Sequence, residues 1–246
     1  MTLGSRRFRP DKNDNSLVIE QNNVSGRVSY WVDGAHQSVA DANGISLADY
    51  IHAMYAFLRQ TRARDVLMIG CGGGTLATML DRDGVAVTIV DIDPRSFDLA
   101  RRYFHLPGAV TTHVADGAEF LRRTRGRYDA IVLDAYNGGD FPDVFKKPAY
   151  LASVKSHLAG ANAIYLENML VDDDEDRAPD NRVRLLQTVW PEVRLLDCHG
   201  WVDRNAVIAA GAVRGLRKPK LILRPSRHAK KVERDLESLR FRRLRT

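Results

Sequence analysis

Short apolar runs alternate with amphipathic stretches through most of the chain. The runs at 66–69, 87–90, 110–114 and 128–133 are each followed closely by a glycine or an aspartate. Strands that alternate with helices in this way are typical of an α/β fold with a parallel sheet. We therefore predict a doubly wound, Rossmann-like sheet. Helices are expected over 45–61, 94–104, 118–125, 146–158 and 181–189, and further strands over 163–166, 193–198 and 205–211, the last two as an antiparallel pair.

The first part of the chain has a different pattern. Alternating apolar and polar residues over 17–20 and 26–32 are followed by the pair Asp33-Gly34, which is a strong signal for a β-hairpin. A small antiparallel β region is therefore expected over residues 16–44, ahead of a catalytic domain at 45–213. Residues 1–15 show no periodicity, and we expect this segment to be mobile.

Positive charge is concentrated at the end of the chain. Residues 214–246 contain thirteen Lys and Arg against three acidic residues, whereas the whole chain has a net charge of +6. The preceding residues are therefore mildly acidic, which argues against a nucleic-acid-binding surface over the whole protein. A basic helix is expected over 224–244, and its apolar stripe of Val232, Leu236, Leu239 and Leu244 favours docking on the main domain or on a partner subunit. Binding of nucleic acid or of an acidic partner by this tail is the less favoured alternative.

Several classes of protein are disfavoured by composition. No apolar run approaches the roughly eighteen residues of a membrane span, and residues 1–14 lack the apolar segment of a secretory signal. A cytoplasmic location is therefore expected. Cys71 and Cys198 lie in unrelated contexts, so the sequence predicts neither a metal site nor a disulfide framework.

A glycine-rich turn follows the apolar run at 66–69. Gly70, Gly72 and Gly74 allow a sharp turn and a close approach of the backbone to a ligand, and Asp91 ends the next apolar run about twenty residues later. A carboxylate at this place accepts hydrogen bonds from ribose hydroxyls. The last glycine of the dinucleotide fingerprint is missing, so the pattern favours an S-adenosylmethionine-type nucleoside and a methyltransferase-type fold over a dinucleotide. A turn without any ligand is the remaining alternative.

Three predicted strands end in an aspartate: Asp91, Asp116 and Asp134. The carboxyl ends of parallel strands meet at one edge of a sheet, so these carboxylates are expected to line one crevice. Asp91 would bind the ribose and Asp116 the adenine amine. Asp134 would lie nearer the reactive end, where it could bind an amine or take its proton. The alternative for Asp134 is a helix cap or a contact with solvent.

With these residues, the chain resembles the spermidine synthase family, the aminopropyltransferases that move the propylamine group of decarboxylated S-adenosylmethionine to a polyamine. The resemblance extends over residues 16–212. It rests on Asp33-Gly34 with Gln37, on His52 and Met54, on the glycine turn, on the segments 90–93 and 115–117, and on Asp134 followed by Phe145 and Tyr150.

The resemblance implies a role for each matching residue. Asp134 corresponds to the acid that deprotonates the attacking amine, and a homodimer acting on a small-molecule amine is implied. The implied co-substrate contacts are Gln37, Gly70, Gly72, Gly73, Gly74, Asp91, Ile92, Asp116 and Gly117, and the implied acceptor contacts are His52, Tyr136 and Asn137.

This chain departs from the family at three acidic positions. Gly73 stands where the family has an Asp that holds the co-substrate's amino group, Ala53 replaces a Glu, and Asn137 replaces a second Asp. Each lost charge-assisted hydrogen bond costs about 1.5–3 kcal/mol. The segment 134–139 is closer to divergent bacterial spermidine synthase-like proteins. Asp49, Asp140 or the acidic run at 172–176 are candidates for replacement charge, although such a run is more often a solvated loop.

Three functions remain open from the sequence. The first is an aminopropyltransferase-like enzyme with Asp134 as general base. The second is a methyltransferase that uses ordinary S-adenosylmethionine, because Gly73 would no longer repel its carboxylate. The third is a nucleoside-binding module without turnover, whose basic tail recruits a partner.

Overall fold

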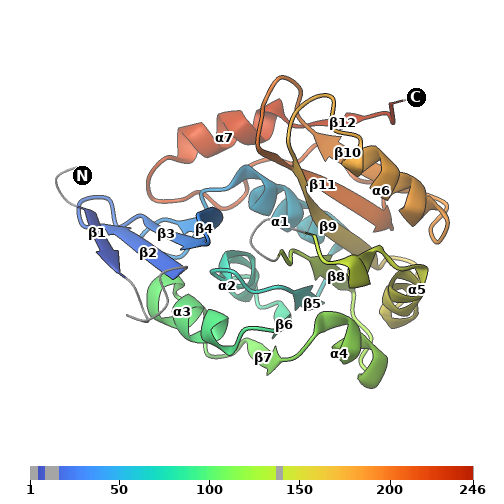
Figure 1. Ribbon diagram of the computed structural model, residues 1–246, viewed down its shortest axis with the longest axis horizontal. Coiled ribbons are helices and arrows are strands. Elements are labelled where there is room, and N and C mark those ends of the chain that lie inside the picture. The colour runs from blue at the N-terminus through green and yellow to red at the C-terminus, as the bar shows by residue number, and fades with distance from the viewer. Residues whose placement is uncertain (1–4, 9–16, 137–140, 246) are drawn as a thin grey trace.

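Two β-sheets and the helices around them make up the protein (Figure 1). The computed structural model describes residues 5–8, 17–136 and 141–245. The smaller sheet is antiparallel and has the order β1-β2-β3-β4. Its strands are β1 (Ser5–Phe8), β2 (Leu17–Asn22), β3 (Val28–Val32) and β4 (Ala35–Ala40).

The expected hairpin is present between β3 and β4. Asp33 and Gly34 form its turn with φ values of 49° and 79°, and two positive φ angles are what a tight hairpin turn requires. The segment 5–8, for which the sequence predicts no regular structure, instead forms the edge strand β1 against β2. Its polar side chains face solvent, so backbone pairing forms this strand without any apolar periodicity that the sequence could show.

The main sheet has the order β12-β10-β11-β9-β8-β5-β6-β7. Neighbouring strands from β9 to β7 are parallel, and β11, β10 and β12 extend the sheet with antiparallel pairs. The predicted doubly wound sheet and its closing antiparallel pair are therefore confirmed. The strands are β5 (Asp65–Ile69), β6 (Ala86–Asp91), β7 (Thr111–Val114), β8 (Ala130–Leu133), β9 (Ile164–Val171), β10 (Val193–Asp197), β11 (Arg204–Gly211) and β12 (Arg240–Arg242).

Helices cover both faces of the main sheet (Figure 1). Helices α1, α2, α3 and α7 pack on one face, and α4, α5 and α6 on the other. Alternate residues of β5 enter the two cores: Val66 and Met68 face one, and Leu67 and Ile69 the other. The helices are α1 (Asp49–Thr61), α2 (Thr75–Asp81), α3 (Pro94–Phe104), α4 (Gly117–Arg123), α5 (Pro148–His157), α6 (Ala178–Gln187) and α7 (Ala229–Ser238), with a short 3₁₀ turn at Asp143–Lys146.

The first helix begins later than its periodicity indicates. The helix expected from residue 45 starts at Asp49. The reason is that residues 45–47 are held in extended backbone: the amide of Ile45 donates to the Asp41 carboxylate at 2.9 Å, and the amide of Leu47 donates to the carbonyl of Val39 at 3.0 Å. These contacts tie the entry to α1 to the end of β4.

The basic end of the chain is part of the main domain. The helix expected over 224–244 is the shorter α7, and residues 240–242 form β12 on the edge of β10. Leu236 and Leu239 lie in the core that also contains α1, and Val232 is buried as well, as the predicted docking stripe requires. Leu244 packs instead with the core on the opposite face of the sheet, because β12 interrupts the helical register.

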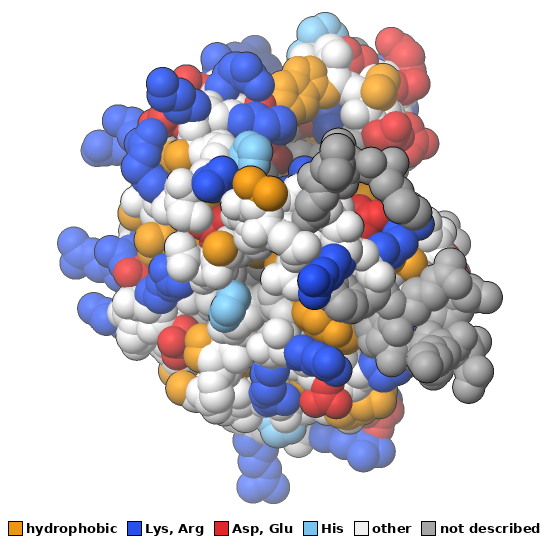
Figure 2. Space-filling view, turned by 90° about the vertical axis from the view of Figure 1, so that its left-hand side faces the viewer, with side chains coloured by type: hydrophobic (Ala, Val, Ile, Leu, Met, Phe, Trp, Pro, Cys, Tyr) orange, Lys and Arg blue, Asp and Glu red, His pale blue; other side chains and the backbone are white. Residues whose placement is uncertain are grey.

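Most Lys and Arg side chains of residues 214–245 remain exposed. Figure 2 shows Lys and Arg gathered on the upper left of one face of the molecule, while acidic side chains gather on the upper right. The cationic groups thus stay at the surface while the apolar stripe is buried. Within the described part of the chain, no helix combines the length and the apolar character needed to cross a membrane.

Candidate active site

A cavity of about 580 Å³ opens at the carboxyl ends of β5, β6 and β8. The N-terminal sheet covers it, since Gln37 and Ser38 of β4 line it together with residues of the main sheet. Both sheets therefore build the site, and the carboxyl edge of the parallel strands holds it as the strand pattern predicts.

The glycine turn after β5 forms part of the cavity wall. Gly70, Gly72 and Gly74 have φ values of 97°, 49° and 64°, which residues other than glycine rarely adopt. A Cβ at Gly70 would lie 2.0 Å from the backbone oxygen of Asp134, so this position has no room for a side chain. Gly70 and Gly72 line the cavity, whereas Gly73 and Gly74 lie outside its lining.

Gly73 packs against an aromatic ring. A Cβ at this position would lie 2.8 Å from Cδ1 of Phe104 and 3.0 Å from Cβ of Ser38. The backbone amide of Gly73 donates a hydrogen bond to Ser38 Oγ at 2.8 Å. The place where the family has an acidic side chain is therefore filled by Phe104 of α3.

Asp91 is fixed at the end of β6 by backbone groups. Its Oδ2 accepts from the amide of Cys71 at 2.7 Å, and its Oδ1 accepts from the amide of Asp93 at 2.8 Å. Burial raises the pKa of Asp91, and these backbone hydrogen bonds oppose the rise. The neighbouring Ile92 also lines the cavity and is 66% exposed. This arrangement leaves carboxylate lone pairs that can accept ribose hydroxyls.

Asp116 and Gly117 line the cavity at the end of β7. Asp116 caps α4, because its Oδ1 accepts from the amide of Glu119 at 2.8 Å. A Cβ at Gly117 would lie 2.3 Å from Cγ2 of Ile69, so a larger residue would separate α4 from β5. The cap holds Asp116 in one orientation beside the adjacent strand ends.

Asp134 is held by two hydrogen-bond donors at the end of β8. The Tyr50 hydroxyl donates to Oδ2 at 3.3 Å, and Asn168 Nδ2 donates to Oδ1 at 2.8 Å. Burial raises the pKa of Asp134, and the hydrogen bonds from Asn168 and Tyr50 lower it in part. A half-buried carboxylate with a raised pKa is a stronger base than an exposed aspartate.

Tyr50 and Asn168 were not among the residues singled out from the sequence. Tyr50 is the second residue of α1, and Asn168 lies in the middle of β9, far from Asp134 along the chain. For Asn168, the signal was a polar pair, Glu167 and Asn168, within a largely apolar strand, since buried polar groups usually need a partner. For Tyr50, the sequence contained no comparable signal.

The structure separates the three implied acceptor contacts. Tyr136 lines the cavity, and its hydroxyl donates to the backbone oxygen of Asn168 and accepts from the amide of Leu170, both at 2.9 Å. His52 is buried outside the cavity lining, with Nε2 placed 2.8 Å from the backbone oxygen of Ser46. Asn137 lies outside the described residues, as does Asp140.

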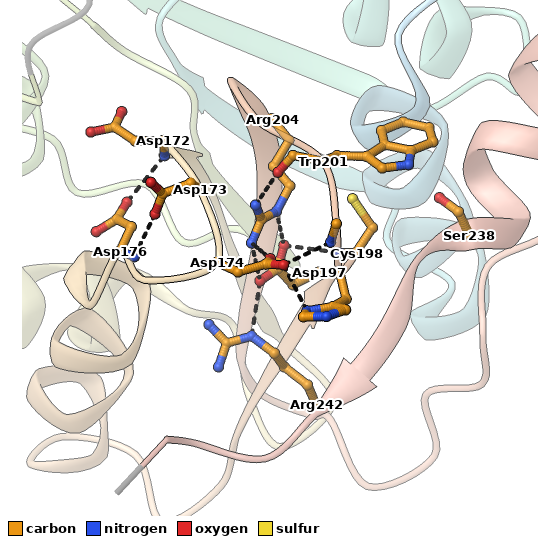
Figure 3. Close-up of polar contacts among 12 residues, drawn as sticks. Asp172, Asp173, Asp174, Asp176, Asp197, Cys198, Trp201, Arg204, Ser238 and Arg242 are labelled. Carbon is orange, nitrogen blue, oxygen red and sulfur yellow. Dashed lines mark hydrogen bonds and ion pairs between the residues drawn. The ribbon is translucent and has the colours of Figure 1, made fainter.

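The acidic run at 172–176 does not line the cavity, and its Asp174 belongs to a network of ion pairs. Figure 3 shows Asp174 and Asp197 converging on Arg204, and Arg242 reaching Asp197 from another direction. Arg204 lies 3.1 Å from Asp174 and 2.8 Å from Asp197, and His199 lies 2.8 Å from Asp174. Asp49 does not line the cavity either; its carboxylate accepts from the amide of Tyr50 at 2.9 Å.

The charge of the cavity is negative. Its described lining contains five aspartates and neither Lys nor Arg. The pKa of its one histidine, His36, is lowered by burial and by the charge of Arg27, which favours the neutral ring. The site is thus suited to a cationic ligand. The five are Asp33, Asp91, Asp93, Asp116 and Asp134.

Known proteins with similar sequences and folds include both aminopropyltransferases and methyltransferases. A family described as "Methyltransferase domain" matches residues 66–159. A polyamine aminopropyltransferase from Chromobacterium violaceum is 35% identical over 117 residues, which make up 45% of this chain and 44% of that protein. The chain spans less than half the length of the curated relatives that it matches.

Solved structures share the fold over a larger part of the chain. A probable spermidine synthase from Corynebacterium glutamicum has a TM-score of 0.75 at 16% identity, covering 97% of this chain and 90% of that one. Human methyltransferase-like protein 13 in complex with SAH has a TM-score of 0.54 at 20% identity, covering 78% of this chain and 88% of that one. The sequence matches and the shared fold together show that the chain resembles spermidine synthases and has a methyltransferase-type Rossmann fold.

Proposed function

We propose that this protein is an aminopropyltransferase that binds decarboxylated S-adenosylmethionine and transfers its aminopropyl group to an amine. The observation that carries the proposal is the cavity lining, which has five aspartates and no Lys or Arg among its described residues. The decarboxylated co-substrate carries a sulfonium and an ammonium but no carboxylate. Its charge therefore complements this cavity better than that of ordinary S-adenosylmethionine.

The residues of the chain divide the work between binding and chemistry. Gly70 and Gly72 let the backbone approach the nucleoside, Asp91 accepts the ribose hydroxyls, and Asp116 accepts from the adenine amine. Such positioning of the two reactants supplies a large part of the acceleration in a bimolecular transfer. Gln37, on β4 of the covering sheet, borders the same cavity.

Asp134 is the proposed general base. A neutral amine nitrogen attacks the methylene carbon beside the sulfonium, forming an N–C bond as the C–S bond breaks. The electron pair of the broken bond moves to sulfur, so that neutral methylthioadenosine leaves. Asp134 takes the proton from the nitrogen, while Tyr50 and Asn168 keep its carboxylate oriented.

A direct test compares the two co-substrates by calorimetric titration at equal salt. We expect the decarboxylated form to bind at least about tenfold more tightly, which is about 1.4 kcal/mol. Asp134→Asn should abolish release of methylthioadenosine and retain binding, whereas Asp98→Asn, at an exposed position of α3, should leave both unchanged. Unchanged turnover by Asp134→Asn would refute the mechanism.

A methyltransferase is the second candidate, and the packing of Gly73 favours it. Phe104 occupies the space next to Gly73, so no acidic side chain selects the amino group of a decarboxylated co-substrate there. The match of residues 66–159 to a methyltransferase domain points the same way. Tighter binding of ordinary S-adenosylmethionine, together with methyl transfer detected by mass spectrometry across an amine panel, would establish this function instead.

A further inference from the structure

Among the residues that the structure describes, one side of the cavity carries a single ionisable carboxylate. This side, the acceptor wall, consists of Asp134 and Tyr136 after β8, Asn168 and Leu170 of β9, and Asn205 of β11. The other lining aspartates come from the β3–β4 turn and from the ends of β6 and β7. Tyr136 stays neutral, because burial raises the pKa of its hydroxyl far above the ordinary value.

An oxygen next to Asp134 can accept a hydrogen bond but has no donor among the described residues. Asn168 is 3% exposed, and its Nδ2 is used on Asp134, but its Oδ1 is buried without a hydrogen-bond donor among the described residues. A buried amide oxygen without a donor is costly and usually indicates a missing ligand or water. Nδ2 and Oδ1 of Asn168 belong to one amide group, and Nδ2 contacts Asp134. The unpaired Oδ1 therefore lies close to the proposed base.

The register of the sheet places two more side chains along the acceptor wall. Leu170 lies opposite Asn205 in the antiparallel β9–β11 pair, so both side chains share the face that lines the cavity. They lie two residues beyond Asn168, or about 7 Å farther along the strand. The Asn205 side chain has no hydrogen bond to another described residue, and Leu170 is 38% exposed.

Aromatic rings continue this neutral surface. The rings of Tyr136 and Phe141 are 5.6 Å apart, and those of Phe141 and Phe145 are 6.0 Å apart. Phe145 itself lines the cavity. A second ammonium group reaching this part of the site would meet an amide, an aliphatic side chain and aromatic rings, but no described carboxylate. Amides and aromatic rings attract an ammonium more weakly than a carboxylate does, so this wall favours a second positive charge less than an acidic wall would.

We propose that the acceptor is a primary monoamine with an uncharged body. Its nitrogen donates one hydrogen bond to Asp134 and one to Asn168 Oδ1, and its lone pair faces the methylene carbon. Its body lies along Leu170 and Asn205. This inference rests on the proposed aminopropyl transfer. The bonds formed and broken are the same as in that step, so the product is a secondary amine and Asp134 carries the proton.

The test measures methylthioadenosine release from decarboxylated S-adenosylmethionine with butylamine, phenethylamine and diaminobutane. The first and third differ only in a terminal amine, so their kcat/KM ratio isolates the second charge. We expect both monoamines to exceed diaminobutane by at least about tenfold. Equal or greater turnover of diaminobutane overturns the monoamine inference and leaves aminopropyl transfer standing. Binding of the co-substrate without release by any amine overturns the proposed function itself.

A charge introduced on the acceptor wall provides a second test. Asn205→Asp places a carboxylate opposite Leu170, and we expect it to raise kcat/KM for diaminobutane relative to butylamine by about tenfold. Asn181→Asp makes the same chemical change at an exposed position of α6 and should leave the ratio unchanged. An unchanged ratio in a folded Asn205→Asp variant contradicts the proposed path of the acceptor along this wall.

Discussion

Asp134 shows at the scale of single residues how a fold tunes a base. Burial favours the neutral acid, while the Tyr50 hydroxyl and the Asn168 amide favour the carboxylate. The raised pKa is the balance of these opposing effects. Each donor therefore affects the pH at which the proposed base loses its proton, as well as the orientation of its carboxylate.

Tyr50→Phe is expected to move the acidic limb of the kcat/KM profile to higher pH. Removal of a donor destabilises the carboxylate, so the pKa of Asp134 rises further and the base is protonated over a wider acidic range. The loss of rate on the plateau should be smaller than the about 10²–10⁴-fold that a general base contributes. Tyr55→Phe is the control, because this hydroxyl, also on α1, bonds to Asp83 outside the cavity. An unshifted limb would show that Tyr50 does not act on Asp134.

Gly73→Asp is expected to destabilise the protein. The new Cβ would approach Cδ1 of Phe104 to 2.8 Å, and overpacking of this kind costs about 1–3 kcal/mol. Adding Phe104→Leu should recover part of this loss and increase the preference for the decarboxylated co-substrate, as urea unfolding and calorimetry would show. Gly108→Asp, where a Cβ meets nothing within 4 Å, is the control. Equal stability of the two Asp variants would contradict the packing argument.

At the scale of elements, charged contacts attach the end of the chain to the main sheet. Arg242 of β12 lies 2.9 Å from Asp180 of α6 and 2.8 Å from Asp197 of β10. Burial alone would raise the pKa of Asp197, but hydrogen bonds from Arg204 and Arg242 outweigh it and hold that pKa below its ordinary value. The stability that this pairing contributes is therefore present above the unfolded-state pKa and is lost as the pH falls through the folded-state value.

Arg242→Met is expected to lower the free energy of unfolding at neutral pH by about 3–5 kcal/mol, because two buried carboxylates lose a partner. The variant should also lose less stability than the parent chain between neutral and acidic pH, since less ion pairing is left to break. Urea unfolding at several pH values measures both effects. Arg240→Met, an exposed neighbour in the same strand, should change stability by no more than about 0.5 kcal/mol. Similar effects of the two substitutions would argue against this ion-pair account.

At the scale of the whole molecule, the cavity joins the two sheets. Residues of β4 and of the glycine turn line the same space, so a ligand that fills it would contact both parts of the fold. Ser38 Oγ already accepts from the amide of Gly73 across this junction at 2.8 Å. A ligand that binds only when both sheets are in place stabilises them as one unit.

Decarboxylated S-adenosylmethionine at about one hundred times its Kd is expected to add about 2.7 kcal/mol to the free energy of unfolding. Hydrogen exchange measured by mass spectrometry should slow in β3 and β4 as well as in the glycine turn. Methylthioadenosine, which lacks the ammonium, should protect less at equal concentration. Protection confined to the main sheet would mean that the N-terminal sheet takes no part in binding.

Local signals in the sequence predicted much of the fold. Gly70, Gly72 and Asp91 identify the turn and the strand end that line the cavity, and Asp33-Gly34 identifies the hairpin that covers it. These signals are readable because turns and strand ends depend on backbone angles within a few residues. Pairings between distant segments left no such trace: β1 on β2 and β12 on β10 are edge strands held by backbone bonds.

The sequence by itself determined the class of fold and which strand ends carry carboxylates, because periodicity and glycine placement are local properties. Only the tertiary structure decided which groups surround Asp134. Tyr50 is 84 residues from it and Asn168 is 34, and their approach depends on the packing of α1 and on the order of strands in the sheet. The same packing placed Phe104 beside Gly73 and paired Asp174 of the acidic run with Arg204 outside the cavity lining. A site's chemistry depends on distances of a few ångströms, and the packing of segments far apart in the chain sets those distances.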